Sequence, residues 1–322
     1  MGPEGDVARV IAVANLKGGI GKTTTVVNVG AGLALKGARV LLVDTDAQGN
    51  LAMALGIHPR RTLYDVLVDG APAERCIVEA RPGLDLLPAD ATLLGAQPII
   101  ARRPDWSRVL AQALQPVASA YDFVLIDSAG SLTPLNVNAL VCAHDVIAPT
   151  TVEHFSVKSL ELLTLQIGRI KGAAGQVRMI IPTMYDPRVR QSGELLAQLR
   201  TRYGDRVTPP VRVNVRLSEA PALGKTIYEY DPRSRGAIDY AMLVEHISRS
   251  FGFTARPQPA RPPSVAPQHP APPAAPPVPT RSDAPETCPH CGQTLHHTHL
   301  AGYRISYCVQ CRYKKQELIR GR

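Results

Sequence analysis

The residues best suited to chemistry lie near the N-terminus, in the stretch LKGGIGKTT (16–24). Its glycines allow the backbone to turn its N–H groups inward, an arrangement that binds phosphate groups. Lys22 can reach the terminal phosphates of a nucleotide, and Thr23 can bind Mg²⁺ through its hydroxyl. The residues expected to contact the nucleotide here are Gly18, Gly19, Ile20, Gly21, Lys22, Thr23 and Thr24.

Two residues of this stretch depart from the usual phosphate-loop pattern, G-x-x-x-x-G-K-[ST]. Leu16 stands where glycine is usual, and Lys17 is an additional lysine. The glycines that the turn requires are still present, two to five residues further on. The stretch also follows a run expected to form a strand and precedes an expected helix, so we predict a working phosphate loop.

Acidic residues end two apolar runs that are typical of strands. Asp127 ends FVLID (123–127), where it can hold the magnesium through its water shell. Asp44 and Asp46 lie at the end of LLVDTD (41–46), and alternation along a strand puts both on the same side. One can support the metal while the other orients or activates the attacking water. Either could instead cap the turn that follows.

Runs rich in β-branched residues alternate with helical patterns over the first 250 residues. Helices are expected, for example, over 22–37 and 156–170. Such alternation indicates an α/β fold, a mostly parallel, twisted sheet with helices on both faces. In this class the ligand lies at the carboxyl ends of the strands, where the motifs above fall. The strands are expected over 8–15, 38–46, 121–130, 144–150 and 176–183.

Composition divides the chain into three parts. Residues 256–285 contain 12 prolines in 30 positions, which predicts an extended linker without a core of its own. This linker separates an expected phosphate-loop domain (1–255) from a small C-terminal domain (286–322). No run has the length of a membrane span and no signal peptide is evident, so we expect a cytoplasmic protein with reduced cysteines.

Positive charge is concentrated at the C-terminal end. The chain has 36 Lys and Arg against 27 Asp and Glu, a formal net charge of +9, and residues 256–322 hold 9 basic against 3 acidic residues. This distribution favours an acidic polymer such as nucleic acid as a partner. A solvated basic tail would have the same composition.

The stretch ANLKGGIGKTTTVVNVGAGLALKGARVLLVDTDAQGN (14–50) resembles the opening of the ParA/Soj family, the partition ATPases of bacterial chromosomes and plasmids. That family belongs to the ATPases with a deviant phosphate loop, K-G-G-x-G-K-T. The likeness continues through YDFVLIDSAGSLTPLNVNAL (121–140) and NVRLSEAPALGKTIYEYDPRSRGAIDY (214–240), and it covers roughly residues 8–251.

The resemblance implies a dimer that forms on ATP and binds DNA non-specifically. Lys17 would cross the two-fold interface to the partner's phosphates, Asp46 would activate the water, and Asp44 would support the metal. A ParB-like partner would stimulate hydrolysis, and the protein would be associated with the nucleoid. The residues ranked first for DNA contact in this part are Arg216, Arg233 and Arg235.

The chain departs from the family's usual sequence at six positions in four places. The family usually has Gln at Leu16, Pro at Ala47, two prolines at Ala129–Gly130 and Pro-Arg at Arg212–Val213. We expect the Ala129–Gly130 pair to loosen the loop after Asp127 and to alter switching or basal turnover. The change at 212–213 leaves the adenine contacts unassigned.

The C-terminal stretch CPHCGQTLHHTHLAGYRISYCVQC (288–311) predicts a zinc ribbon. Two C-x2-C pairs separated by 16 residues suit a tetrahedral site, with a β-hairpin between them turning near Ala301–Gly302. It resembles the zinc finger of formamidopyrimidine-DNA glycosylases, in which an arginine touches DNA, and Arg304 lies close to that position. A structural or protein-binding ribbon is the alternative. The expected zinc ligands are Cys288, Cys291, Cys308 and Cys311.

Other functions remain open at this point. A ParA-like positioning ATPase could carry a protein assembly instead of DNA. An iron–sulfur carrier ATPase would use a C-x2-C pair, but such pairs normally lie in the ATPase body. A MinD-like membrane switch would need a C-terminal amphipathic helix, where this chain has prolines and cysteines.

Overall fold

The computed structural model describes residues 8–172, 175–254, 286–300, 303–308, 310–311 and 314–318 of the chain. The chain divides into two compact units, Met1–Ala260 and Arg261–Arg322. The linker expected over 256–285 lies outside the described residues. In the part that the structure describes, no helix is both long and apolar enough to span a membrane.

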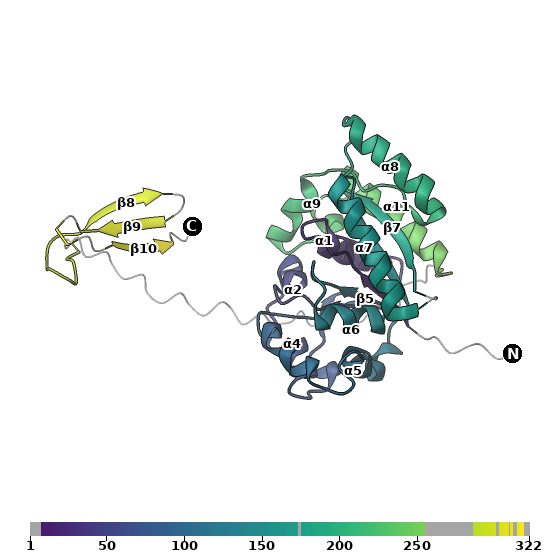
Figure 1. Ribbon diagram of the computed structural model, residues 1–322, viewed down its shortest axis with the longest axis horizontal. Coiled ribbons are helices and arrows are strands. Elements are labelled where there is room, and N and C mark those ends of the chain that lie inside the picture. Colours follow the sequence, from purple (N-terminus) through teal and green to yellow (C-terminus); the bar gives the residue numbers. More distant parts are fainter. Residues whose placement is uncertain are drawn as a thin grey trace. The chain divides into compact units, whose positions relative to one another are not determined.

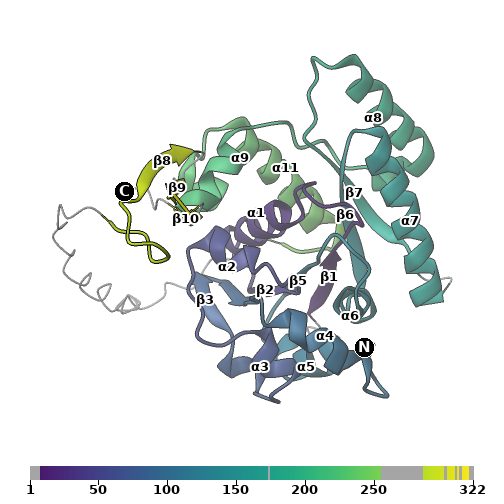
Figure 2. The same cartoon turned by 60° about the vertical axis from the view of Figure 1, so that its left-hand side comes forward.

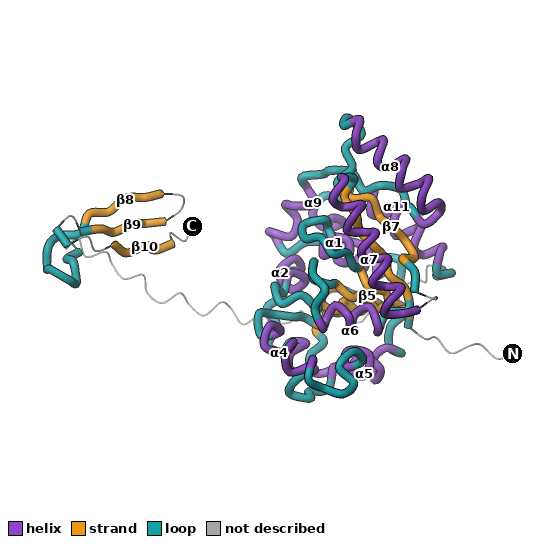
Figure 3. Tube along the Cα trace, viewed as in Figure 1, coloured by secondary structure: helices purple, strands orange, loops and turns teal. Residues whose placement is uncertain are grey.

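A seven-stranded sheet forms the centre of the first unit (Figures 1 and 3), in the order β3-β4-β2-β5-β1-β6-β7. Neighbouring strands are parallel except for β3, which is antiparallel to β4. The predicted mostly parallel sheet is confirmed, whereas the β3–β4 pair at one edge was not predicted. The strands are β1 Arg9–Val13, β2 Val40–Asp44, β3 Val78–Arg81, β4 Leu84–Leu87, β5 Phe123–Asp127, β6 Asp145–Thr151 and β7 Val177–Thr183.

Helices cover both faces of this sheet. One buried cluster joins the sheet to α1, α2 and α11, and the other joins it mainly to the helices from α3 to α7. Figure 2 shows these two layers on opposite sides of the strands. The helices are α1 Lys22–Leu35, α2 Asn50–Leu55, α3 Leu63–Leu67, α4 Leu93–Ala101, α5 Val109–Ala118, α6 Pro134–Cys142, α7 His154–Lys171, α8 Arg190–Tyr203, α9 Arg216–Glu219, α10 Ile227–Tyr230 and α11 Arg235–Ser250, with short 3₁₀ turns η1 Ala73–Arg75, η3 Gly204–Arg206 and η4 Ala220–Leu223.

The central strands bury side chains on both of their faces. In β5, Val124 and Ile126 belong to the cluster with α3–α7, and Phe123 and Leu125 belong to the cluster with α1. This explains why these strands are continuously apolar in sequence. By the same alternation, Asp127 at the end of β5 lies on the face that carries α1.

The second unit contains a three-stranded antiparallel sheet in the order β10-β9-β8. Its strands are β8 His296–Leu300, β9 Tyr303–Tyr307 and β10 Lys314–Leu318. The predicted hairpin corresponds to β8 and β9, and its turn at 301–302 lies outside the described residues. β10 was not predicted.

Candidate functional site

The loop between β1 and α1 has the backbone of a phosphate-binding turn. Gly19 and Gly21 adopt left-handed conformations, with φ of 71° and 88°, which side chains with a Cβ rarely adopt. Gly21 is the N-cap of α1, and no side chain caps the helix there. The first N–H groups of α1 are therefore available to an anion. Ile20, in contrast, is buried, and its carbonyl accepts a hydrogen bond from Thr183 Oγ1 at 2.8 Å.

Lys22 lies inside this loop. Its side chain is largely buried, and its Nζ donates a hydrogen bond to the Lys17 carbonyl at 2.9 Å. Burial lowers the pKa of Lys22, while the nearby carboxylates of Asp127 and Asp46 act in the opposite direction. The ammonium group is thus held where the loop would surround a phosphate chain.

The side chains of Thr23 and Asp127 lie together and offer oxygen ligands to a hydrated cation. Thr23 Oγ1 donates a hydrogen bond to Asp127 Oδ2 at 2.7 Å. Asp127 Oδ1 is buried without a hydrogen-bond partner among the described residues. Burial raises the pKa of Asp127 to about 7. A hydroxyl beside a buried carboxylate oxygen that lacks a partner fits a magnesium ion or its bound water.

Asp44 is buried at the end of β2. It lies beside Asp127 in the register of β2 and β5. Its Oδ1 accepts from the Asp46 N–H at 2.9 Å, and its Oδ2 accepts from the Leu51 N–H at 3.1 Å. Burial and the charge of Asp127 raise its pKa well above the usual range. These hydrogen bonds fit the structural alternative, in which Asp44 caps the turn that leads into α2, and its metal-supporting role stays a prediction.

Asp46 lies beyond the end of the strand. The strand expected over 38–46 ends at Asp44, because the Asp44 carboxylate binds the Asp46 N–H and turns the chain. Asp46 is partly exposed, and its Oδ1 accepts from the Gln48 N–H at 3.0 Å. A partly exposed carboxylate beside the phosphate loop is able to meet a water molecule.

Lys17 points away from its own loop. Its Nζ forms an ion pair with Glu153 Oε2 at 2.9 Å and donates to Ser156 Oγ at the same distance. Glu153 is the N-cap residue of α7. The contact therefore joins the phosphate loop to the start of α7, 136 residues further along the chain. No local sequence pattern indicates this contact, and the role of Lys17 across a dimer interface stays a prediction.

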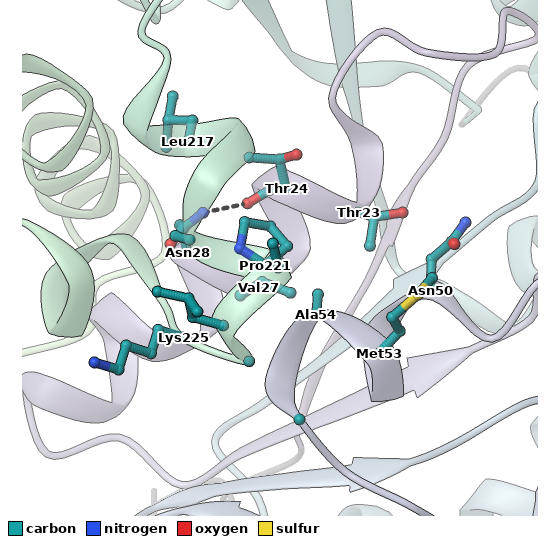
Figure 4. Close-up of a pocket in the computed structure, with 15 residues that line it drawn as sticks. Thr23, Thr24, Val27, Asn28, Asn50, Met53, Ala54, Leu217, Pro221 and Lys225 are labelled. Atoms are coloured by element: carbon teal, nitrogen blue, oxygen red, sulfur yellow. Dashed lines mark hydrogen bonds between the residues drawn. The ribbon is translucent and has the colours of Figure 1, made fainter. Parts of the chain in front are cut away.

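A pocket of about 650 Å³ adjoins the phosphate loop on the side of α1. Thr23 and Thr24 lie at its wall, together with residues of α2 and of the segment from Leu217 to Lys225 (Figure 4). Asn28 Nδ2 donates to the Thr24 carbonyl at 2.8 Å, drawn as a dashed line in Figure 4. Lys22 and the three aspartates do not line this pocket, so the phosphate chemistry lies beside it.

The four predicted cysteine ligands come together in the second unit. Their sulfur atoms all lie within 4.8 Å of one another, with Cys288–Cys311 at 3.4 Å and Cys291–Cys308 at 3.5 Å. A tetrahedral site with Zn–S bonds of about 2.3 Å has sulfur–sulfur separations of about 3.8 Å. The donor set and spacing therefore fit a zinc ion.

The predicted DNA-contacting arginines differ in their surroundings. Arg216 forms an ion pair with Glu219 at 2.9 Å and a longer one with Asp231 at 3.5 Å. Arg233 and Arg235 are exposed, and within the described parts of the chain neither side chain has an ion pair. The backbone of Arg304 lies in β9, paired with β8 and β10.

Comparison with known proteins gives consistent results. A family model described as an AAA domain matches residues 8–178. The chromosome partitioning protein ParA of Caulobacter vibrioides is 40% identical over 249 residues, covering 74% of this chain and 93% of that protein. The chromosome-partitioning ATPase Soj of Thermus thermophilus is 41% identical over 243 residues, covering 74% of this chain and 95% of that protein.

A solved structure shows the same fold with its nucleotide. Cobyrinic acid a,c-diamide synthase from Mycobacterium smegmatis, with a bound ATP analogue and magnesium, is 31% identical with a TM-score of 0.67. The match covers 80% of this chain and all of that one. Together with the phosphate loop, these matches show that the chain is an ATP hydrolase that uses ATP with magnesium, and that it belongs to the ParA/Soj family of partition ATPases.

Proposed function

We propose that this protein dimerises when it binds ATP, binds DNA without reading its sequence, and segregates a chromosome or plasmid with a ParB-like partner. The observation that carries the proposal is the surface around the phosphate loop. This surface presents Lys17, whose ammonium group makes no contact within the loop, at the carboxyl end of the sheet. Exposed apolar side chains also lie at that end. The protein would act in the cytoplasm, associated with the nucleoid.

The residues of the site would have different roles in hydrolysis. The N–H groups from Gly18 to Thr24 and the Lys22 ammonium would bind the phosphate chain, and Thr23 and Asp127 would hold the magnesium. Magnesium, when bound, offsets phosphate charge. Asp46 would orient the water whose oxygen bonds to the terminal phosphorus, as the bond to the bridging oxygen breaks and ADP leaves. Asp44 would keep the turn of Asp46 in place.

Exposed apolar side chains support a dimer interface on this edge. Leu132 follows β5, Phe155 follows β6 and Met184 follows β7, and 47%, 76% and 50% of their surfaces are exposed. Because these strands are parallel to β1, their carboxyl ends lie at the same end of the sheet as the phosphate loop. Large apolar groups gathered on one edge mark an interaction surface. A second copy would cover them and receive Lys17.

The arginines support phosphate-driven DNA binding. The Arg216 side chain contacts the Asp231 carboxylate, and the backbone N–H of Arg233 donates to the same carboxylate at 3.3 Å. Arg216 and Arg233 therefore lie close together. Exposed ion pairs such as that of Arg216 are weak, and a DNA phosphate can replace the acidic partner. The Arg212 guanidinium, in contrast, donates to both carboxylate oxygens of Asp239, at 3.0 Å and 2.6 Å, which favours a structural role for it.

The second unit would be a zinc ribbon that adds a contact to DNA or to protein. Its buried apolar cluster, in the part described, consists of Cys288, Leu295 and Cys308. A unit with so small a core depends on metal binding for its folding free energy. A colourless protein with one zinc per chain would support this assignment, whereas a brown protein with iron–sulfur absorbance would overturn it.

The variant Asp46→Ala tests the proposed cycle. Without the residue that orients water, the protein should bind ATP and DNA, hydrolyse ATP slowly and remain on DNA as a dimer. Asp69→Ala is the matched control, because Asp69 is an exposed carboxylate just after α3. Nucleotide turnover and DNA retention would be measured together. Rapid turnover by Asp46→Ala would refute its role, and ATP-dependent dimers that never bind DNA would favour a protein cargo.

A further inference from the structure

The outward side of α7 carries leucines where a surface helix usually carries polar residues. Leu160, Leu163 and Ile167 are buried in the cluster that joins the helix to the sheet, which fixes the inward side of α7. Leu162 and Leu165 lie on the other side, with 54% and 51% of their surfaces exposed. Figure 2 shows α7 at the outer side of β6 and β7. Neighbouring exposed leucines on the solvent side of a helix mark an interaction surface.

Two cations extend this pair of leucines in both directions along α7. Lys158 lies four residues before Leu162, and Arg169 lies four residues after Leu165. At 3.6 residues per turn, the four side chains fall within about 60° of one another and span about 17 Å of the helix. We call these four residues the α7 row. Both cations are exposed, and in the part of the chain that the structure describes neither has an ion pair.

No acidic residue of α7 neutralises the row. Glu161 is the one acidic residue within the helix, and it forms an ion pair with Arg202 at the end of α8. The row therefore presents two apolar side chains between two positive charges. A partner that covers it has to be apolar in the middle and acidic at both ends.

A second copy of this chain does not match the row. The spacing of its residues, four, three and four, is the same when it is read in either direction. Two rows packed in parallel would place Lys158 against Lys158, and two antiparallel rows would place Lys158 against Arg169. Like charges face each other in both arrangements, which disfavours self-pairing.

We propose that the α7 row is a docking site for an acidic amphipathic helix of a partner protein, with the pattern E-x3-L-x2-L-x3-E. The partner's leucines would cover Leu162 and Leu165, and its carboxylates would pair with Lys158 and Arg169. Spacings of three and four residues let two helices interlock their side chains along one seam. Docking here involves no residue of the proposed nucleotide site.

Synthetic peptides test the charge preference of the row. A fluorescent helical peptide with the pattern E-x3-L-x2-L-x3-E would be titrated with the full-length protein without nucleotide, and binding followed by anisotropy. A second peptide would carry lysines in place of the two glutamates. We expect the acidic peptide to bind about tenfold more tightly than the basic one at low salt. The double variant Lys158→Glu, Arg169→Glu should reverse this preference.

A matched pair of leucine variants tests the apolar part of the row. Leu165→Ser should weaken binding of the acidic peptide about tenfold, because a buried leucine contact is lost. Leu94→Ser is the control, since Leu94 is an equally large apolar side chain in α4 with 64% of its surface exposed. That change should leave the affinity unaltered. Unaltered ATP turnover would show that each variant has folded.

Three results would overturn the proposal. The acidic peptide could fail to bind, or it could bind equally to Leu165→Ser and Leu94→Ser. The nucleotide-free protein could associate with itself in light scattering and lose this association in Leu165→Ser, which would make a second copy the occupant. Vesicles of anionic phospholipid could bind the row in place of the peptide. Each of these results would leave the proposed function standing.

Discussion

Lys17 and Lys22 lie five residues apart, and their ammonium groups have different partners. The Lys22 ammonium contacts the carbonyl of Lys17 inside the loop, whereas the Lys17 ammonium reaches out to Glu153. The first arrangement serves the protein's own phosphate site. The second leaves Lys17 partly exposed on the edge proposed to meet a second copy, with 30% of its side chain accessible.

Lys17→Ala should abolish ATP-dependent dimerisation, because the charge that would offset the partner's phosphates is removed. Glu153→Ala is the matched control. It removes the intramolecular partner of Lys17, so the dimer should form at least as readily as in the unaltered protein. Light scattering with and without an ATP analogue measures both. A Lys17→Ala protein that dimerises normally would contradict the proposed role.

Asp127 should make the metal-free protein less stable as the pH rises. Its pKa is raised from 3.8 to about 7, so between these values the folded state binds a proton more tightly than the unfolded state. Stability is then greatest below about pH 4 for this group and is lost towards pH 7, at about 1.4 kcal/mol per pKa unit. Asp127→Asn should flatten this slope in thermal unfolding without magnesium. An unchanged slope would show that the group does not titrate in this range.

At the scale of elements, α1 is fixed by close packing against the sheet and α11. A Cβ added to Gly30 would lie 2.7 Å from Leu42 Cδ2 and 3.2 Å from Leu84 Cδ1. On the other side, a Cβ at Gly32 would lie 2.6 Å from Val244 Cγ2 of α11. The two glycines let the helix that follows the phosphate loop lie close to both layers.

Gly30→Ala should therefore destabilise the protein by about 1–3 kcal/mol, although alanine is the better helix former. Gly95→Ala in α4 is the matched control, because a Cβ there meets nothing within 4 Å. That change should stabilise the protein by up to about 1 kcal/mol. Urea unfolding measures both differences. If the two variants moved in the same direction, packing at Gly30 would not limit the position of α1.

The elements predicted from sequence are those whose pattern is local. The apolar runs of β1, β2, β5, β6 and β7 were recognised because both faces of each strand are buried. The β3–β4 hairpin was missed, since each strand has only four residues and β3 is only partly buried. Its one local sign was Gly83, which adopts a φ of 76° between the strands.

The parts of the site that could be predicted are likewise those with a local sequence pattern. The phosphate loop and the aspartates at strand ends have sequence signatures, and so do the paired cysteines. The contacts of Lys17 with Glu153 and of Thr23 with Asp127 depend on the folded chain. Only the sheet topology brings β1, β5 and β6 side by side, and no local pattern encodes those distances.

At the scale of the whole molecule, the basic C-terminal unit should contribute to DNA binding. Deleting residues 286–322 should weaken binding and flatten its salt dependence, because each lost phosphate contact reduces the slope by about one unit. Removing zinc from the full-length protein with a chelator should have the same effect, since the unit depends on its metal. Binding that is unchanged by both treatments would assign the ribbon to protein contacts.

The proposed function requires that DNA binding by this protein depend on ATP. The most direct measurement is the affinity for DNA of unrelated sequences, at one fixed salt concentration, with no nucleotide, with ADP and with a non-hydrolysable ATP analogue. The proposed function predicts tight, sequence-independent binding by dimers with the analogue and weak binding in the other two conditions. Equal affinity in all three conditions would contradict it.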